Sequence, residues 1–147
     1  MKVREEDCAE NVAFRKPTEQ SSTWWKYIAS IAVDGDVNTA TSTNQGSSPH
    51  WWKVNFQGIK VIDEIKIRIR MRPYATTYDV VMSNTTDFQE SKHCYTIRNN
   101  YGQNSPRNVE FRCVDGITIA KSMRVDLVDF NALSIEEVTV FGWNGQS

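Results

Sequence analysis

A strict alternation of apolar and charged residues runs through EIKIRIRMR, residues 64–72, and it narrows the fold of this chain more than any other stretch. The apolar members all fall on one parity: Ile65, Ile67, Ile69 and Met71. The other parity is occupied by basic residues: Lys66, Arg68, Arg70 and Arg72. Because successive side chains of a β-strand point to opposite faces, the stretch predicts a strand with one buried face and one face of four like charges.

More stretches show the same period of two, and the segments between them are typical of turns. The alternating stretches cover residues 52–56, 78–82, 109–113, 123–127 and 138–140. Residues 41–49 and 98–106 are rich in Asn, Gly, Ser and Pro, which favour turns. Residues 23–32 supply at most a turn or two of helix. Short strands separated by turns predict an all-β domain, either a β-sandwich or a barrel.

Size, charge and motifs limit what the chain can do. Its 147 residues suffice for one domain with its own core, and its formal net charge of -1 disfavours the usual basic type of nucleic-acid binder. No segment reaches the ~18 apolar residues of a membrane span, and the start, MKVREEDCAE, lacks the apolar core of a signal peptide. Motifs of common hydrolases, phosphate-binding loops and redox sites are absent from the sequence. We therefore expect a protein without catalytic activity.

Four segments in a fixed order carry a resemblance to a known family. They are IAVDGDVNTATS at 31–42, PHWWKVNF at 49–56, the basic strand, and SIEEVTVFGW at 134–143. This ordered set resembles the coagulation-factor C-terminal, or discoidin, superfamily of galactose-binding-like domains, and within it the F-type lectins, or fucolectins. The resemblance implies a β-sandwich jelly roll over residues 11–143, with an N-terminal extension at 1–10 and a C-terminal tail at 144–147.

The Asp-Gly-Asp turn at 34–36 suits a calcium ion. Calcium takes six to eight oxygen ligands, and a tight turn can supply several from carboxylates and backbone carbonyls. The resemblance implies a structural calcium with side-chain ligands from Asp34 and Glu137. Its further ligands would be the carbonyl oxygens of Ile31, Asp36 and Glu136, and a hydroxyl of Ser42 or Thr43. The alternative is a solvated turn with an exposed glutamate.

The cysteines bear on the compartment. The resemblance implies a disulfide between Cys94 and Cys113 and gives Cys8 no role. A disulfide is typical of a secreted or cell-surface protein, so we expect an extracellular location. In the alternative, all three thiols are reduced, the calcium turn is not used, and the chain is an intracellular protein-interaction domain.

Sugar binding in F-type lectins uses a His and two Arg side chains in a pocket at one end of the sandwich. Arg72 or Arg70 matches the first Arg, and His50 is the nearest match to the His. Pro73 and Tyr74 follow where the family has Arg-x-Asp, and the second Arg has no counterpart. The resemblance therefore implies a glycan partner and leaves fucose specificity open.

The basic row allows two interpretations. Residues on one face of a strand are roughly 6.6 Å apart, and arginine binds carboxylate, sulfate or phosphate with two parallel hydrogen bonds, so the row suits an anionic glycan. Alternatively, the bases pair with acids on neighbouring strands: Asp126, Glu110 or Glu137. We expect Arg72 or Arg70, at the loop end, to contact ligand, and Lys66 and Arg68 to form a paired outer face.

The aromatic stretch TWWKY, residues 23–27, offers a second function. Trp24 and Trp25 beside Lys26 have the composition of a platform for a sugar ring, and equally of a spike at a membrane interface. One of the two indoles could instead close the end of the sandwich. We expect a glycan-binding module, with docking on an anionic membrane or an extracellular protein partner as the alternative, and cell adhesion as the setting. Multimers would raise the avidity of such a module.

Overall fold

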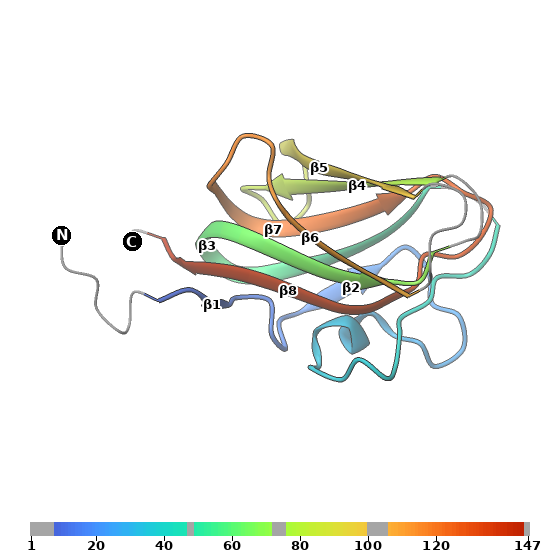
Figure 1. Ribbon diagram of the computed structural model, residues 1–147. Coiled ribbons are helices and arrows are strands. Elements are labelled where there is room, and N and C mark those ends of the chain that lie inside the picture. The colour runs from blue at the N-terminus through green and yellow to red at the C-terminus, as the bar shows by residue number, and fades with distance from the viewer. Residues whose placement is uncertain (1–7, 47–48, 72–75, 100–105, 146–147) are drawn as a thin grey trace.

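The computed structural model describes residues 8–46, 49–71, 76–99 and 106–145 and consists almost entirely of antiparallel strands (Figure 1). The elements are β1 (Glu10–Asn11), β2 (Thr18–Gln20), the 3-10 helix η2 (Ala29–Val33), β3 (His50–Ile69), β4 (Thr76–Ser83), β5 (Ser91–Asn99), β6 (Arg107–Arg112), β7 (Thr118–Leu127) and β8 (Ile135–Asn144). The predicted all-β architecture is confirmed.

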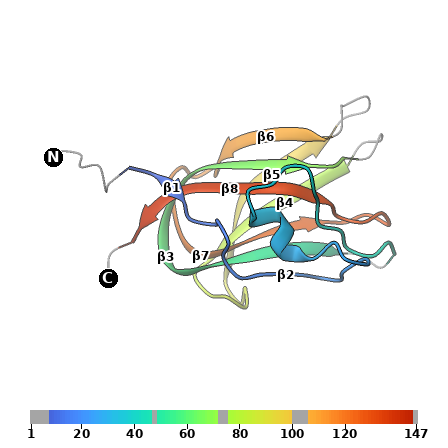
Figure 2. The same ribbon diagram turned by 90° about the horizontal axis from the view of Figure 1, so that it is seen from below.

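Strand β3 belongs to both layers of the sandwich. Its first part, residues 50–55, pairs with β2 and β7, and its later part, residues 60–69, pairs mainly with β8 and β6. The register to β7 shifts between Asn55 and Lys60, where Gln57 and Gly58 adopt positive φ angles of 60° and 138°. Figures 1 and 2 show the result, with β4, β5 and β7 stacked over β8 and the later part of β3. The sequence predicts two separate strands here; the structure has one strand, β3, which bends at Gln57 and Gly58.

The alternating parity of the basic strand is confirmed by burial. Ile65, Ile67, Ile69 and Met71 are all 5% exposed or less. They join Trp52, Phe56 and the inward residues of β4, β7 and β8 in one core between the layers. The apolar half of the pattern therefore fixes which face of β3 is inside.

A disulfide closes the side of the sandwich where β5 and β6 meet. Cys94 of β5 is bonded to Cys113, which follows β6, and the Val114 amide donates to the Cys94 carbonyl at 2.7 Å. The rings of Tyr95 and Phe111 stack beside this link, 4.5 Å apart. The implied pairing of Cys94 with Cys113 is confirmed, and Cys8 is exposed.

Gly142 provides a test of the packing of β8 on β3. A Cβ at this position would collide with the Val61 carbonyl oxygen, which belongs to the rigid backbone of β3. We expect Gly142→Ala to lower the free energy of unfolding by about 1–3 kcal/mol, the usual cost of overpacking. The measurement is the urea midpoint at unchanged m-value, and an unchanged midpoint would contradict this close approach of the two backbones.

Candidate functional site

One extra residue interrupts β8 near its start. Glu137 lies opposite Arg68 of β3, whereas Ile135 lies opposite Ile69, so Glu136 is unmatched and forms a β-bulge. The flanking residues Ile135 and Val138 are fully buried in the core. The bulge leaves two consecutive carboxylates with contacts outside the core, and each has a different partner.

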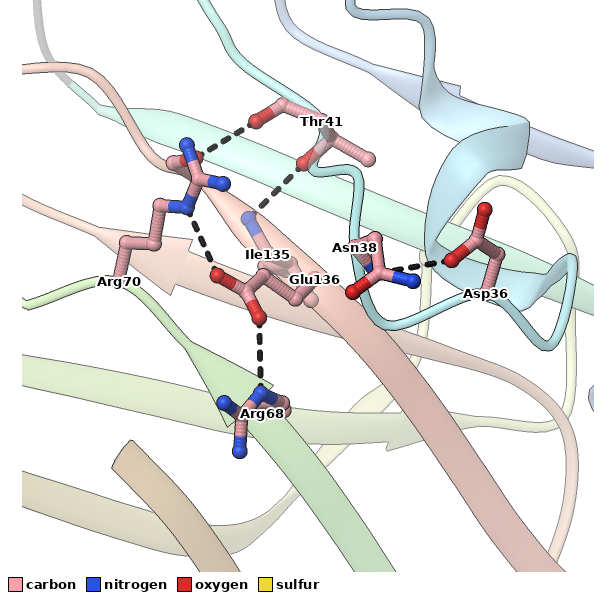
Figure 3. A network of polar contacts seen from close by, with 8 residues as sticks. Asp36, Asn38, Thr41, Arg68, Arg70, Ile135 and Glu136 are labelled. Carbon is pink, nitrogen blue, oxygen red and sulfur yellow. Dashed lines mark hydrogen bonds and ion pairs between the residues drawn. The ribbon is translucent and has the colours of Figure 1, made fainter. Parts of the chain in front are cut away.

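Glu136 holds two arginines of the basic row (Figure 3). Its Oε1 accepts from Arg68 Nε at 2.8 Å and its Oε2 accepts from Arg70 Nε at 2.9 Å. The Glu136 side chain is 6% exposed and that of Arg70 is 50% exposed. Burial raises the pKa of Glu136, but the hydrogen bonds and charges of Arg70 and Arg68 outweigh burial, so the pKa lies below its ordinary value.

The expected pairing of the basic row is therefore partly confirmed and partly corrected. Lys66 pairs with Glu110 at 3.6 Å across the β3–β6 ladder, as expected. The partner of Arg68 is Glu136, not Glu137, because of the bulge. Asp126 pairs with Arg124 on its own strand.

Three backbone segments are hydrogen-bonded side by side: Arg70 at the end of β3, residues 133–135 before and at the start of β8, and the loop residues 41–43. The Arg70 amide donates to the Ser134 carbonyl at 3.0 Å. On the other side of this segment, the Thr41 and Thr43 amides donate to the carbonyls of Ile135 and Leu133. The Thr41 hydroxyl oxygen also accepts from the Ile135 amide (Figure 3). Residues 133–135 thus connect Arg70 with the loop that begins at Thr41.

Glu137, the second carboxylate of the bulge, faces the Asp-Gly-Asp turn. Its Oε2 accepts from the Gly35 amide at 3.2 Å, while its Oε1 is buried and has no hydrogen-bond partner among the described residues. Burial raises the pKa of Glu137 to about 7; the Gly35 hydrogen bond opposes this rise, and the charges of Asp34 and Asp36 add to it. A partly buried carboxyl with one unsatisfied oxygen, close to two other acids, is an arrangement that a cation would stabilise.

The chemistry of this turn fits calcium in part. Asp34 and Glu137 could each turn a carboxylate oxygen to an ion, and Ile31 and Asp36 lie in the same turn region. Within the described ranges, no three acidic, histidine or cysteine side chains converge as a metal-binding group, so further ligands would have to come from backbone carbonyls or water. The side chain of Glu136 is held by arginine, which leaves only its carbonyl for such a role.

The hydroxyls of Ser42 and Thr43, one of which is expected at the calcium site, both have other partners. Ser42 Oγ donates to the Thr43 carbonyl at 2.9 Å. Thr43 Oγ1 accepts from the Leu133 amide at 2.9 Å and lies 3.0 Å from His50 Nδ1. Ser42 and Thr43 also line a pocket next to the turn.

His50 lies behind that pocket and does not line it. The residue is 2% exposed, and its Nε2 has no hydrogen-bond partner among the described residues. His50 and Trp52 lie two residues apart in β3, so their side chains point to the same face, and Trp52 is buried. This spacing indicates burial of His50 and not contact with a sugar. His50 reaches the pocket only through Thr43.

A pocket of about 510 Å³ opens at this end of the molecule. It is lined by Trp24, Ser42, Thr43, Asn44, Gln45 and Ala132. Trp24 is 53% exposed, and its ring stacks on Tyr27 with centroids 5.4 Å apart. The sequence predicts a turn over residues 41–49 and gives no role to Asn44, Gln45 or Ala132. For Asn44 and Gln45, the many polar side chains of that stretch are the one signal of such a role.

Four further residues were expected to contact ligand, namely Trp25, Arg70, Arg72 and Tyr74. Neither Trp25 nor Arg70, the two that the structure describes, lines the pocket. Trp25 is 69% exposed, with Lys26 Nζ 4.5 Å from the centre of one of its rings. Arg70 lies at the loop end of β3, as expected. Arg72 and Tyr74 lie outside the described residues, so their predicted ligand contacts stay predictions.

The Glu136 network and the Lys66 pair offer a matched test of stability. We expect Glu136→Gln to lower the free energy of unfolding by about 2 kcal/mol, because one arginine loses its acceptor and the hydrogen bond to the other is no longer charge-assisted. Glu110→Gln, at an exposed pair, is expected to change it by less than about 0.5 kcal/mol.

Urea denaturation at several pH values measures both effects. Because the pKa of Glu136 is lowered in the folded state, its contribution is present above about pH 4.5 and is lost as the pH falls through the lowered value. Equal effects of the two substitutions at neutral pH would show that the Glu136 network is no stronger than a surface ion pair.

Comparison with solved structures gives the same architecture. Chitosan-binding module 2 from a chitosanase/glucanase of Paenibacillus sp. IK-5, in complex with chitotriose, is 24% identical, with 92% of this chain and 100% of that chain covered and a TM-score of 0.73. A fucolectin from striped bass (Morone saxatilis) serum is 18% identical, with 92% and 50% covered and a TM-score of 0.77. The lectin domain of lectinolysin, complexed with Lewis B antigen, is 23% identical, with 93% and 98% covered and a TM-score of 0.72.

The sequence itself assigns the family. No curated protein matches the chain. The family model described as NedA-like, galactose-binding domain matches residues 31–127, which is more than half of the chain and includes the Asp-Gly-Asp turn and the basic strand. The expected resemblance is therefore confirmed: this chain belongs to the family of NedA-like, galactose-binding domains of the coagulation-factor C-terminal, or discoidin, superfamily.

Proposed function

We propose that this chain is a carbohydrate-recognition module without catalytic activity, and that it binds a glycan in the pocket beside Trp24. The observation that carries the proposal is the composition of that pocket, in which a half-exposed indole stands beside the side chains of Asn44 and Gln45. An aromatic face packs against the C–H face of a sugar ring, and amides hydrogen-bond its hydroxyls. Structures of similar fold are complexes with chitotriose and with Lewis B antigen, which supports glycan binding by this chain.

We also propose an extracellular location and a structural calcium. The disulfide between Cys94 and Cys113 supports an oxidising compartment. The half-satisfied Glu137 carboxyl beside Asp34 supports a cation at the turn. Calcium there would join η2 and its turn to β8, and its role would be structural.

A glycan array tests the sugar site. Wild type is expected to bind a restricted set of saccharides, with binding competed by the free sugar. Trp24→Ala is expected to weaken binding at least tenfold, because the stacking surface is lost, whereas Trp25→Ala is expected to leave it within about twofold. Binding that survives in Trp24→Ala would move the sugar away from this pocket, and no binding by folded protein in calcium would overturn the proposed function.

Thermal and chemical unfolding test the calcium proposal. Calcium at a 100-fold excess over its Kd is expected to stabilise wild type by about 2.7 kcal/mol relative to chelator. Glu137→Gln is expected to lose this response, and in chelator to be no less stable than wild type, because the neutral amide is not repelled by Asp34 and Asp36. Glu136→Gln is the control, since its side chain contacts arginine, and its response to calcium is expected to persist. Identical unfolding of wild type in calcium and in chelator would contradict the proposal.

Docking on an anionic membrane or on a protein is the second candidate, and the exposed Trp25 beside Lys26 favours it. In the described part of the chain, no helix is long and apolar enough to cross a membrane. Docking would depend on Trp25 more than on Trp24 and would weaken with salt. The two tryptophan substitutions therefore separate the two candidates.

A further inference from the structure

We propose that Arg68 and Arg70 form a subsite for an anionic group, a sulfate or a carboxylate, on the glycan that occupies the neighbouring pocket. This inference rests on the proposed function and adds a ligand class to it. The two arginines are held by one carboxylate, Glu136 (Figure 3). The backbone of Arg70 is linked through Ser134 to Thr41, at the start of the loop that lines the pocket.

Among the described residues, both guanidinium groups are bound through Nε and have no acceptor at their terminal nitrogens. Each arginine contacts Glu136 through Nε, at 2.8 Å for Arg68 and 2.9 Å for Arg70. Figure 3 shows the Nη atoms of both side chains on the far side from this carboxylate. Two parallel N–H groups of a guanidinium match the oxygens of a sulfate or carboxylate.

The charge of this group is not balanced. Two cations share one anion, which leaves an excess of one positive charge. Elsewhere in the described part of the chain, ion pairs join one cation to one anion, as in Lys66 with Glu110 and Arg112 with Asp63. An anion placed against Arg68 and Arg70 would therefore meet a local excess of positive charge on a chain whose net charge is -1.

The group is also held in place before any ligand arrives. Glu136 is almost fully buried, and its position is fixed by the bulge between Ile135 and Glu137. A side chain that is already ordered loses less conformational entropy on binding, which favours affinity. Arg68 and Arg70 are nevertheless one-third and one-half exposed, so a ligand can approach them.

The pocket is near enough for one oligosaccharide to reach both places. The Arg70 amide bonds to Ser134, and Ser134 lies beside Thr41, whose chain continues into the pocket residues Ser42 and Asn44. Two strand spacings separate Arg70 from the loop at Thr41, which is roughly 10 Å. A short glycan with its neutral ring on Trp24 and an acidic substituent toward Arg70 fits this spacing.

The test uses saccharides printed in matched neutral, sulfated and sialylated forms on one array. Wild type is expected to bind an anionic form at least tenfold more tightly than its neutral counterpart. Arg70→Gln and Arg68→Gln are each expected to reduce this preference at least fivefold. Lys66→Gln removes the same charge from the same face of β3 at a residue paired with Glu110, and is expected to preserve the preference. Thermal unfolding confirms that each variant is folded.

The outcomes separate this inference from the proposed function. Binding that depends on Trp24 without any preference for anionic forms would overturn the subsite and leave the lectin proposal standing. An equal loss of the preference in Lys66→Gln would also overturn it, because a general positive field would then suffice. No binding of any form would overturn both. As a direct probe, sodium sulfate titrated against sodium chloride of equal ionic strength is expected to shift the side-chain NMR signals of Arg68 and Arg70 in wild type, and unchanged signals would count against the subsite.

Discussion

The extra residue in β8 is the constraint on which the site depends. In a regular strand, Ile135 and Val138 could not both face the core, and one of the two glutamates between them would have to point inward. An unpaired carboxylate in that core would cost several kcal/mol. The bulge avoids this cost, since both isoleucine and valine are buried while both carboxylates find partners elsewhere.

The same bulge separates two groups of opposite charge. Glu136 draws together Arg68 and Arg70, where positive charge is in excess. Glu137 stands beside Asp34 and Asp36, where negative charge is in excess and the pKa of the glutamate is raised to about 7. Neither excess is neutralised by the described residues, and the two lie on adjacent positions of one strand. Ligands of opposite sign, a cation at the turn and an anion at the arginines, would each relieve a cost that the fold carries.

Sequence patterns predicted the part of this structure that depends on alternation. The inward row from Ile65 to Met71 and the outward Lys66–Glu110 pair follow directly from a period of two. The disulfide followed from the resemblance, because spacing alone does not fix a partner for a cysteine. The arrangement of the strands in two layers could not be predicted, because it depends on pairing between residues far apart in the sequence. The bend of β3 at Gln57 was not predicted either, because it does not change the alternation of polar and apolar residues.

The residues of the site were harder to predict, for identifiable reasons. Two apolar residues three apart in a strand, Ile135 and Val138, indicate a bulge. Strict alternation includes no bulge, so the acids expected for the basic row include Glu137 and not Glu136, which is the one that pairs with Arg68. The parity of His50 with Trp52 indicated burial. Asn44 and Gln45 line the pocket because their loop passes Trp24, a contact that depends on tertiary structure and on no local pattern.

The identity of the ligand is a property of these loops more than of the fold. Neighbours with TM-scores of 0.72 to 0.77 share the sandwich at 18–24% identity, yet their names refer to different saccharides. A conserved scaffold with variable end loops allows such changes, because the core packing does not depend on which side chains the loops display. In this chain the loop end combines an indole, two amides and a cationic pair held by a buried carboxylate. Of these, only the cationic pair is held by a carboxylate of the sheet, because Glu136 of β8 binds both arginines. The proposed preference for charge should therefore be the most rigidly determined part of the recognition, and the choice of sugar ring the most easily altered.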